Sequence, residues 1–474
     1  MFSAVVRSLN KPGAIMAVLC AVAFMAQLDL FIVNVALPSM GRSFHGAGLG
    51  SLSWVLNGYA IVFAAALVPA GRLADHLGRR RFLLWGVAVF TLASAICAAS
   101  PNLAVLVGAR VLQSVGAAMI VPTSLGLLLP AFPASRHSFV VGVWASVAAV
   151  AGSSGPPIGG LLLQESWRWV FIINVPIGIA TLLAGRAVLP EVRAEPGTRV
   201  PDLVSATTAL AAITLITLAT VEGSIWGWLS ARLIALVAVA LLALAVTVRR
   251  CFAHPSPLIE PQLFRSREFS VAAVALVLFF MAFAAFLLSV VLFLENVWHY
   301  STLSTGLAIA PGPMMAALVA VNAGRITTRF GRAAPAIAGP LLFAAMSAYW
   351  LWRIGPHSHY LADYLPGGLL GGAGAGLTQA PLFAATGALP HDRAGTGSAV
   401  LSMARQFGSA LGVAILVAIY ASPSPHNLSA FHDGWVFQGA AALLATAASV
   451  VGVMLARHAY RRAPVSTVDV TRHT

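Results

Sequence analysis

Charged residues are scarce in this sequence, and their scarcity excludes most classes of soluble protein. Only 9% of the 474 residues are charged, against about a quarter in an average soluble domain. Repeated apolar runs of about 18 or more residues predict membrane-spanning helices and exclude a membrane β-barrel, whose strands alternate only weakly in hydropathy. The net charge of +14 then predicts basic cytoplasmic loops rather than a nucleic-acid partner, because Lys and Arg collect beside the inner ends of spans.

Lysine, cysteine and paired metal ligands are also scarce. Lys11 is the only lysine and precedes Pro12, so the nucleotide-binding P-loop is missing and ATP-driven transport by this chain alone is excluded. Cys20, Cys97 and Cys251 have no metal-ligand spacing and are expected to be small buried side chains. The sequence has no His-Glu-x-x-His pair and no loop long enough for a soluble sensor domain. We therefore expect neither an enzyme nor a cofactor.

The apolar runs predict about fourteen spans in an all-α integral membrane protein. The first run continues past Asp29 and is too long for the apolar part of a signal peptide, so a retained span is expected. Polar links divide the chain into an N-terminal six-helix bundle at 1–190, a linker with two additional transmembrane helices at 191–268, a C-terminal six-helix bundle at 269–456 and a cytoplasmic tail at 457–474.

One short stretch, Gly71–Arg81, sets the predicted orientation. It holds four arginines and one aspartate in eleven residues between two apolar runs, which is typical of a cytoplasmic loop. With both termini also cytoplasmic, the inner segments carry most of the 28 Lys and Arg residues. Gly324–Arg332 repeats the pattern in the later bundle, with Thr328 in place of Asp75. The repeat favours two related halves, as in many secondary transporters.

Five motifs along the chain carry a family resemblance. They are Leu28–Pro38 in the first predicted span, Gly71–Arg81, Arg110–Gly116 in the fourth span, Gly155–Gly160 in the fifth and Trp167–Pro176 at the start of the sixth. Together they resemble the motifs of the major facilitator superfamily, and within it of the fourteen-span drug:proton antiporter family. The resemblance implies the major facilitator fold in the plasma membrane. It also implies a proton-coupled antiporter that exports amphipathic or cationic drugs by alternating access. Ala151 departs from the family pattern, in which a glycine is usual.

Asp29 and Arg110 are the candidate residues for proton coupling. Asp29 lies among apolar residues, where desolvation favours the neutral carboxyl group, so it is a candidate to gain and lose a proton. Arg110 needs a partner inside its span, with Asp29, Gln113 or Asn34 as candidates, and the resemblance implies a role in proton transfer. In the alternative interpretation Asp29 packs helices and Arg110 is a structural anchor. A structural role is also favoured for Arg405.

Two glycine-containing motifs are candidates for controlling conformational change. In the fifth span, small residues four apart leave one helix face without bulky side chains, which allows close helix packing, and prolines permit a bend. The resemblance adds that this motif accompanies antiport. The antiporter motif comprises Gly155, Pro156, Gly159 and Gly160, and the conformational latch loop comprises Gly71, Arg72, Asp75, Gly78, Arg79 and Arg80. The alternative for the latch loop is a pure topology signal.

Polar and aromatic residues in several spans are candidates for a substrate cavity. They are Asn34, Trp54, Asn57, Tyr59, Gln113, Glu222 and Glu295. Aromatic faces suit lipophilic cations, although a Trp near a span end is more often an interfacial anchor and an acid there is usually solvated. The expected partners are protons, a small-molecule substrate and membrane lipids, with a monomeric chain and the proton gradient as energy source. The alternative function is a dedicated exporter of one endogenous metabolite or self-made antibiotic.

Overall fold

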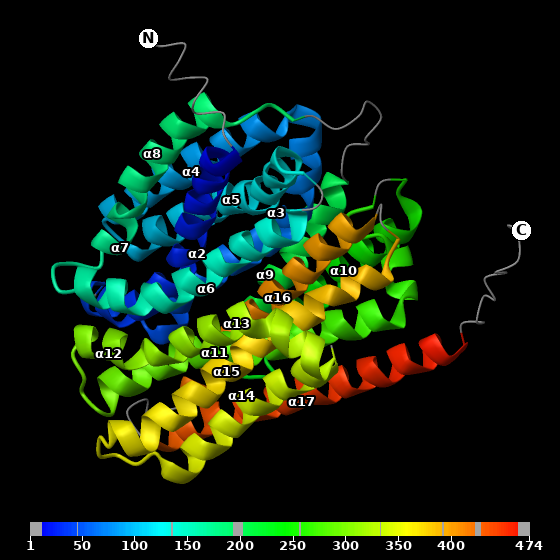
Figure 1. The fold of residues 1–474 in the computed structure, drawn as a ribbon. Helices are drawn as coiled ribbons and strands as arrows, with labels where there is room; N and C mark the ends of the chain where they lie inside the picture. Colours follow the sequence, from blue (N-terminus) through cyan, green and yellow to red (C-terminus); the bar gives the residue numbers. More distant parts are fainter. Residues whose placement is uncertain are drawn as a thin grey trace, which may run out of the picture.

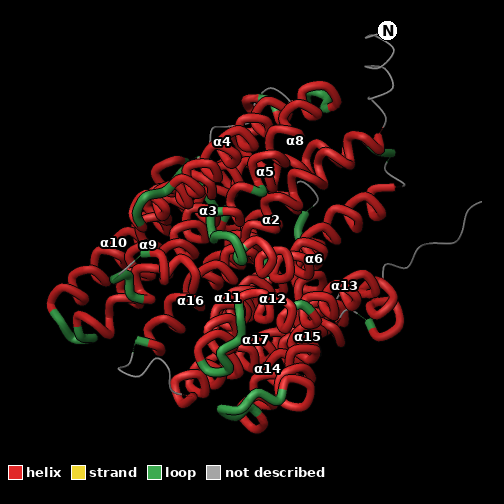
Figure 2. The backbone as a smooth tube through the Cα atoms, turned by 90° about the vertical axis from the view of Figure 1, so that its left-hand side faces the viewer, coloured by secondary structure: helices red, strands yellow, loops and turns green. Residues whose placement is uncertain are grey.

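The computed structural model describes residues 12–44, 46–133, 136–192, 202–255, 257–331, 333–390, 393–421 and 428–462. Within these ranges every regular element is a helix, as the tube in Figure 2 shows. Twelve helical segments are long and apolar enough to cross a membrane. The prediction of an all-α chain with many spans is therefore confirmed.

The helices of the first part of the chain pack together in the upper part of Figure 1. They are α2 (Pro12–Ser43), α3 (Leu49–Leu77), α4 (Arg79–Ala99), α5 (Leu103–Leu128), α6 (His137–Leu162), α7 (Trp169–Ile172) and α8 (Asn174–Val188), with a 3₁₀ turn η1 at Leu129–Ala131. Asn102 begins α5 because its side chain accepts a hydrogen bond from the backbone N–H of Val105 at 2.9 Å. We use the term arginine-rich end for the end of the molecule at which α3 meets α4. The stretch Gly71–Arg81 was predicted to be a loop, but it is helical except at Gly78, because α3 continues to Leu77 and α4 begins at Arg79.

Helices α9 (Leu203–Trp226) and α10 (Ala231–Ala253) pack on each other as a pair. The side chain of Asp202 begins α9 and accepts two hydrogen bonds from Arg250 near the end of α10, both at 2.9 Å. The Arg250 guanidinium and the burial of Asp202 act in opposite directions, and the guanidinium prevails, so the pKa of Asp202 lies below its usual range. These two hydrogen bonds join the start of α9 to the end of α10. Of the two helices, α9 packs on both α3 and α16.

The helices of the last part of the chain lie in the lower part of Figure 1. They are α11 (Arg267–Asn296), α12 (Thr302–Ile309), α13 (Pro311–Phe330), α14 (Ala333–Arg353), α15 (Leu365–Phe383), α16 (Ala394–Tyr420) and α17 (Leu428–Arg462), with the short turns η3 (Pro261–Arg265), η4 (Tyr360–Tyr364) and η5 (Ala384–Ala388). Helix α17 continues past the predicted end of the last span at residue 456, and the rest of the predicted tail, from residue 463, lies outside the described residues.

The apolar core is divided unequally between the two ends of the molecule. At the end opposite the arginine-rich end, one hydrophobic cluster joins the two parts of the chain, including Leu37 and Met40 of α2 and Val290 and Phe293 of α11. At the arginine-rich end, a separate cluster contains residues of α2–α6, α8 and Leu189 only. A third cluster lies between α3, α9 and α16. The two parts therefore share the large cluster at the end opposite the arginine-rich end, and the smaller cluster between α3, α9 and α16 joins them nearer the arginine-rich end.

The repeated pattern at Gly324–Arg332 has a structural counterpart in part. Gly78 ends α3 with φ +96°, and Gly331, in register with it, ends α13 with φ +75°. Only glycine adopts such backbone angles without strain, so both copies use it to stop a helix. Arg332 itself lies outside the described residues.

Candidate functional site

A buried ion pair joins α2 and α5 in the interior of the first part of the chain. Arg110 Nη1 lies 2.5 Å from Asp29 Oδ2, and both side chains are almost completely buried, at 1% and 0% exposed. The same Nη1 donates to Gln113 Oε1 at 2.6 Å, and Gln113 Nε2 donates to Asp29 Oδ1 at 3.0 Å. The sequence-based prediction named these three residues, and the structure brings them into one hydrogen-bonded network.

Other groups hold this network in place. Asn174 at the start of α8 donates from Nδ2 to Asp29 Oδ1 at 3.1 Å, and Ser94 Oγ of α4 accepts from Gln113 Nε2 at 2.8 Å. Arg110 Nε donates to the backbone carbonyl of Val55 at 3.1 Å, and its guanidinium carbon lies 4.2 Å from the ring centroid of Tyr59. Contacts from α3, α4 and α8 therefore hold the Asp29 carboxylate of α2 and the Arg110 guanidinium of α5 in place.

The sequence-based prediction missed Asn174 and Ser94. Asn174 is a polar residue inside an apolar run, and that isolation was a signal that it needed a partner. Cys97 is buried as predicted, and its Sγ lies 3.9 Å from Gln113 Oε1. Cys20 and Cys251 are only half-buried, because they lie on less covered helix faces, so the prediction of buried cysteines was wrong for these two.

The network places two opposite charges in a buried environment. Taking two charges out of water is costly, and mutual attraction offsets this cost only when geometry and extra hydrogen bonds are favourable. Asp29 accepts hydrogen bonds from Arg110, Gln113 and Asn174. A proton that reached Asp29 would compete with Arg110 for the same carboxylate.

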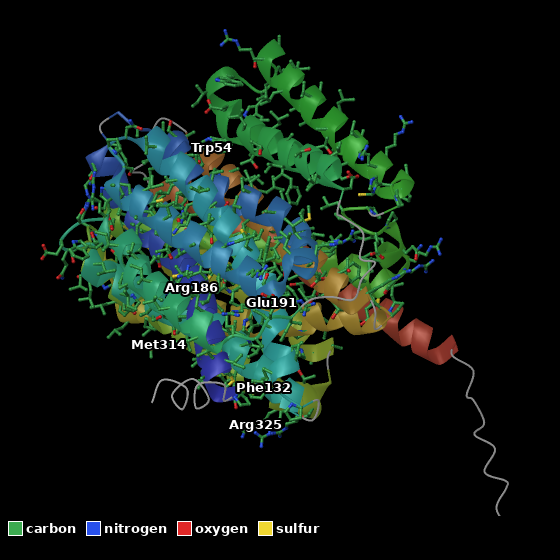
Figure 3. All side chains as sticks on the ribbon, turned by 90° about the horizontal axis from the view of Figure 1, so that it is seen from above. Trp54, Phe132, Arg186, Glu191, Met314 and Arg325 are labelled. Carbon is green, nitrogen blue, oxygen red and sulfur yellow. The ribbon has the colours of Figure 1, made fainter. Side chains whose placement is uncertain are left out.

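The remaining cavity candidates lie in different surroundings. Asn34 donates to the carbonyl of Leu30 one turn earlier in α2, at 2.7 Å, and thus bonds its own helix. Asn57 is fully buried, and its Nδ2 donates to Ser53 Oγ at 3.4 Å. Trp54 packs against the cluster between α3, α9 and α16, and Figure 3 shows it beside the α9–α10 pair. Of these candidates, Tyr59 and Gln113 alone contact the buried ion pair.

The two acidic candidates lie near helix ends. Glu295, near the end of α11, pairs with Arg42 near the end of α2 at 3.0 Å, and the Glu295 side chain is 6% exposed against 61% for Arg42. This ion pair joins the two parts of the chain at the end that carries their shared apolar cluster. Glu222 is half-buried close to the end of α9.

The predicted latch loop is tightly bonded at the arginine-rich end. Arg79 Nε lies 2.7 Å from Asp75 Oδ1, and its Nη1 donates to the carbonyl of Gly126 at 2.7 Å. Glu191 Oε1 accepts from the backbone N–H of Arg80 at 3.2 Å. A side chain at Gly78 would place its Cβ within 2.5 Å of the Glu191 carboxylate. The loop is thus held to α5 and to the segment that follows α8.

Glu260 bridges the two parts of the chain at this end. It lies in the connection between α10 and α11, and its carboxylate is 3.4 Å from Arg72 Nη2 and 3.6 Å from Arg393 Nε. Arg72 belongs to the latch loop, while Arg393 immediately precedes α16. Beside the bridge lies a cavity of about 870 Å³, lined by both charged and apolar side chains, including Asp75 and His254. The sequence-based prediction did not single out Glu260.

The glycines of the fifth-span motif lie where backbones approach most closely. Gly155 and Gly159 pack on α2, where an added Cβ would lie 2.8 Å and 3.0 Å from side-chain atoms of Phe31 and Ile32. Gly160 faces the backbone of α12, and a Cβ on Gly306 of α12 would lie 2.4 Å from the carbonyl oxygen of Pro156. The motif therefore packs the first part of the chain against the second without intervening side chains.

Among the residues that the structure describes, no group of three or more His, Cys, Asp or Glu side chains could hold a metal ion.

Comparison with known proteins gives consistent relatives. Multidrug resistance protein Stp from Mycobacterium tuberculosis is 33% identical over 458 residues, which cover 94% of this chain and 84% of that protein. Cephamycin export protein CmcT from Amycolatopsis lactamdurans is 34% identical over 445 residues, covering 92% and 91%. The tetracenomycin C resistance and export protein from Streptomyces glaucescens is 33% identical over 404 residues, covering 84% and 74%.

A solved structure supports the same fold. A bacterial homologue of the human drug peptide transporters PepT1 and PepT2 matches with a TM-score of 0.68 over 94% of this chain and 99% of that chain, at 15% identity. The family model described as Major Facilitator Superfamily matches residues 19–413. The chain is therefore a multi-pass membrane protein that belongs to the major facilitator superfamily.

Proposed function

We propose that this protein is a proton-coupled antiporter that exports amphipathic or cationic drugs across the cytoplasmic membrane. It has fourteen spans, because the long helices α6 and α15, of 26 and 19 residues, add to the twelve apolar segments. Residues 1–190 and 269–456 form the two halves, and 191–268 carry the inserted pair. Both termini and the arginine-rich end are cytoplasmic, which agrees with the bias of Lys and Arg. The chain acts as a monomer in the lipid bilayer and needs no cofactor.

The observation that carries this proposal is the buried pair of Asp29 and Arg110. Both side chains are removed from solvent, and Asp29 lies near the middle of α2. Ionisable residues in such positions are costly and mark proton relays in transporters. When Asp29 takes up a proton, Arg110 loses its only carboxylate partner, and the contacts between α2, α5 and α8 weaken. The proton gradient thereby changes the packing of helices that face the substrate route.

Alternating access would use the contacts between the halves. In the present conformation, the outer ends are closed by the shared apolar cluster and by the ion pair of Arg42 with Glu295. Outward opening has to break these contacts, while the cytoplasmic ends approach. The latch loop and Glu260 lie where that approach takes place. The Gly160–Gly306 contact provides a close, side-chain-free surface about which the halves rock.

Transport in inverted membrane vesicles tests the proposal. Vesicles with an acidic interior should accumulate a cationic drug when they contain the wild type, and a protonophore should abolish accumulation. Asp29→Asn should abolish the pH-driven part, whereas Glu165→Gln, which removes an exposed acid outside the network, should leave it unchanged. Proton-driven accumulation by Asp29→Asn at normal expression would refute the assigned role of Asp29. Accumulation that survives the protonophore would refute proton coupling altogether.

A dedicated exporter is the second candidate. Two relatives are named for a single antibiotic each, tetracenomycin C and cephamycin. A toxicity panel in an efflux-deficient host separates the candidates. Resistance to several unrelated drugs supports the multidrug function, and resistance to one compound alone supports the dedicated exporter.

A further inference from the structure

Near the middle of the described membrane-spanning helices, basic side chains outnumber acidic ones. Among the described helices, Asp29 is the one acidic residue near the middle of a span, since the others lie near helix ends or in connections. Its carboxylate is committed to Arg110. Arg405, near the middle of the 27-residue helix α16, forms none of the ion pairs found among the described residues.

One N–H group of the Arg405 guanidinium has no acceptor in the described part of the chain. Its Nε is buried and has no hydrogen-bond partner among the described residues, and neither has Nε2 of the adjacent Gln406. Its one close ring contact is with Phe280, whose centroid lies 5.5 Å from the guanidinium carbon. A guanidinium over a ring face keeps its edge N–H groups available, and those groups fit a planar oxyanion in a two-point contact.

Packed aromatic side chains of the hydrophobic core lie next to this cation. Phe280 packs edge-on against Phe279 and Phe283, with centroids 5.5 Å and 5.7 Å apart, and Phe283 continues the contact to Phe286 and Phe343. Phe280 lies near the middle of α11, at the same level of the molecule as Arg405. A fixed positive charge beside a phenylalanine cluster suits a molecule with one anionic group and an apolar ring system.

We propose that Arg405 binds the anionic group of the exported compound, a carboxylate or another planar oxyanion. This inference rests on the proposed export function and extends its substrate class to acidic and zwitterionic amphiphiles. Once Asp29 is protonated, the middle of the membrane-spanning part holds two guanidinium groups and no ionised acid. That charge favours an anionic group over a cationic one. Arg405 is therefore a specificity residue rather than a structural anchor.

A matched pair of dyes tests this assignment. One is a rhodamine with a free carboxylate, and the other is the methyl ester of the same dye. Purified full-length protein is reconstituted in liposomes with an imposed pH gradient, and uptake of each dye is measured for the wild type, Arg405→Gln and Arg405→Lys. Arg232→Gln, which removes an exposed arginine at the start of α10, is the matched control.

We expect Arg405→Gln to raise the KM of the free-acid dye about tenfold, the loss of one charge-assisted contact, and to change that of the ester less than twofold. Arg405→Lys should restore part of the difference, and Arg232→Gln should change neither KM. Equal loss of both dyes with Arg405→Gln, or no change in either, would overturn the inference. If the wild type transports neither dye, the export proposal fails for rhodamine-like compounds. Fluorescence anisotropy then measures the binding of each dye to the purified protein directly. In this binding assay the wild type should bind the free-acid dye more tightly than the ester. Loss of that preference with Arg405→Gln supports Arg405 as the binding residue. Equal binding of the two dyes by the wild type refutes that assignment.

Discussion

Replacing Asp29 by Asn removes the one carboxylate that compensates the buried Arg110 guanidinium. The Arg110 side chain is 1% exposed, so it cannot regain water without a rearrangement of α5. Removing one partner of a buried ion pair typically costs about 3–5 kcal/mol, because the other charge stays buried and unpaired. The amide of Asn still accepts and donates hydrogen bonds, so we expect a loss toward the lower limit, about 3 kcal/mol.

A double-mutant cycle separates the pair from its surroundings. Arg110→Gln alone should cost a similar amount, because it leaves the Asp29 carboxylate buried with only amide donors. The double variant carries no net charge at the site and should lose less than the sum of the single variants, with a coupling of at least about 2 kcal/mol. Thermal unfolding of detergent-purified protein, followed by tryptophan fluorescence, measures all four stabilities.

Additive losses in this cycle would refute the reasoning. They would mean that Asp29 and Arg110 each contribute through separate contacts, such as the ring of Tyr59 beneath the guanidinium. Wild-type stability of Asp29→Asn would be a stronger contradiction, because it would mean that Asp29 is already protonated and uncharged. In that case the proton could not compete with Arg110, and the proposed coupling would lose its basis.

Three further variants test the contacts around the network and between the halves. Asn174→Ala removes a 3.1 Å bond to Asp29 and should cost about 1–3 kcal/mol in the same unfolding assay, and no change would contradict its supporting role. Glu260→Gln removes both bridges at the arginine-rich end and should slow drug uptake severalfold, whereas Glu268→Gln in the first turn of α11 should not. Equal uptake by the two variants would argue against a latch. Gly306→Val should abolish uptake by forcing α6 and α12 apart, and an active variant would show that close contact is not required.

The sequence predicted the buried site better than the contacts between the halves. Asp29, Arg110 and Gln113 stand out because charged and amide groups within apolar runs must find one another. Asn174 lies in one of the five motifs, yet its role depends on α8 passing beside α2, which no local pattern indicates. Ser94 is a common small residue in a span, so its bond to Gln113 could be found only in three dimensions.

Residues at span ends were harder to assign. Glu295 is an acid at a helix end, and such acids are usually solvated, but its side chain is buried against Arg42 from the other half. Glu260 lies in a proline-containing connection where an acid attracts no notice. Its two arginine partners are separated from it by well over a hundred residues along the chain, so only the packing of α3 beside α16 brings the three together.

The inserted helix pair bears on how the halves move. Helix α9 packs on α3 of the first half and on α16 of the second, and a hydrophobic cluster of Ala209, Ile213, Met403 and neighbouring residues joins all three helices. Any rocking of one half against the other must therefore change the packing of α9. The bond of Asp202 to Arg250 holds α10 to α9, and α10 leads directly to the connection that carries Glu260. We therefore expect a displacement of α9 to reach the Glu260 bridge at the arginine-rich end through α10. The α9–α10 pair thus contacts both parts of the chain and leads to the connection whose Glu260 bridges them.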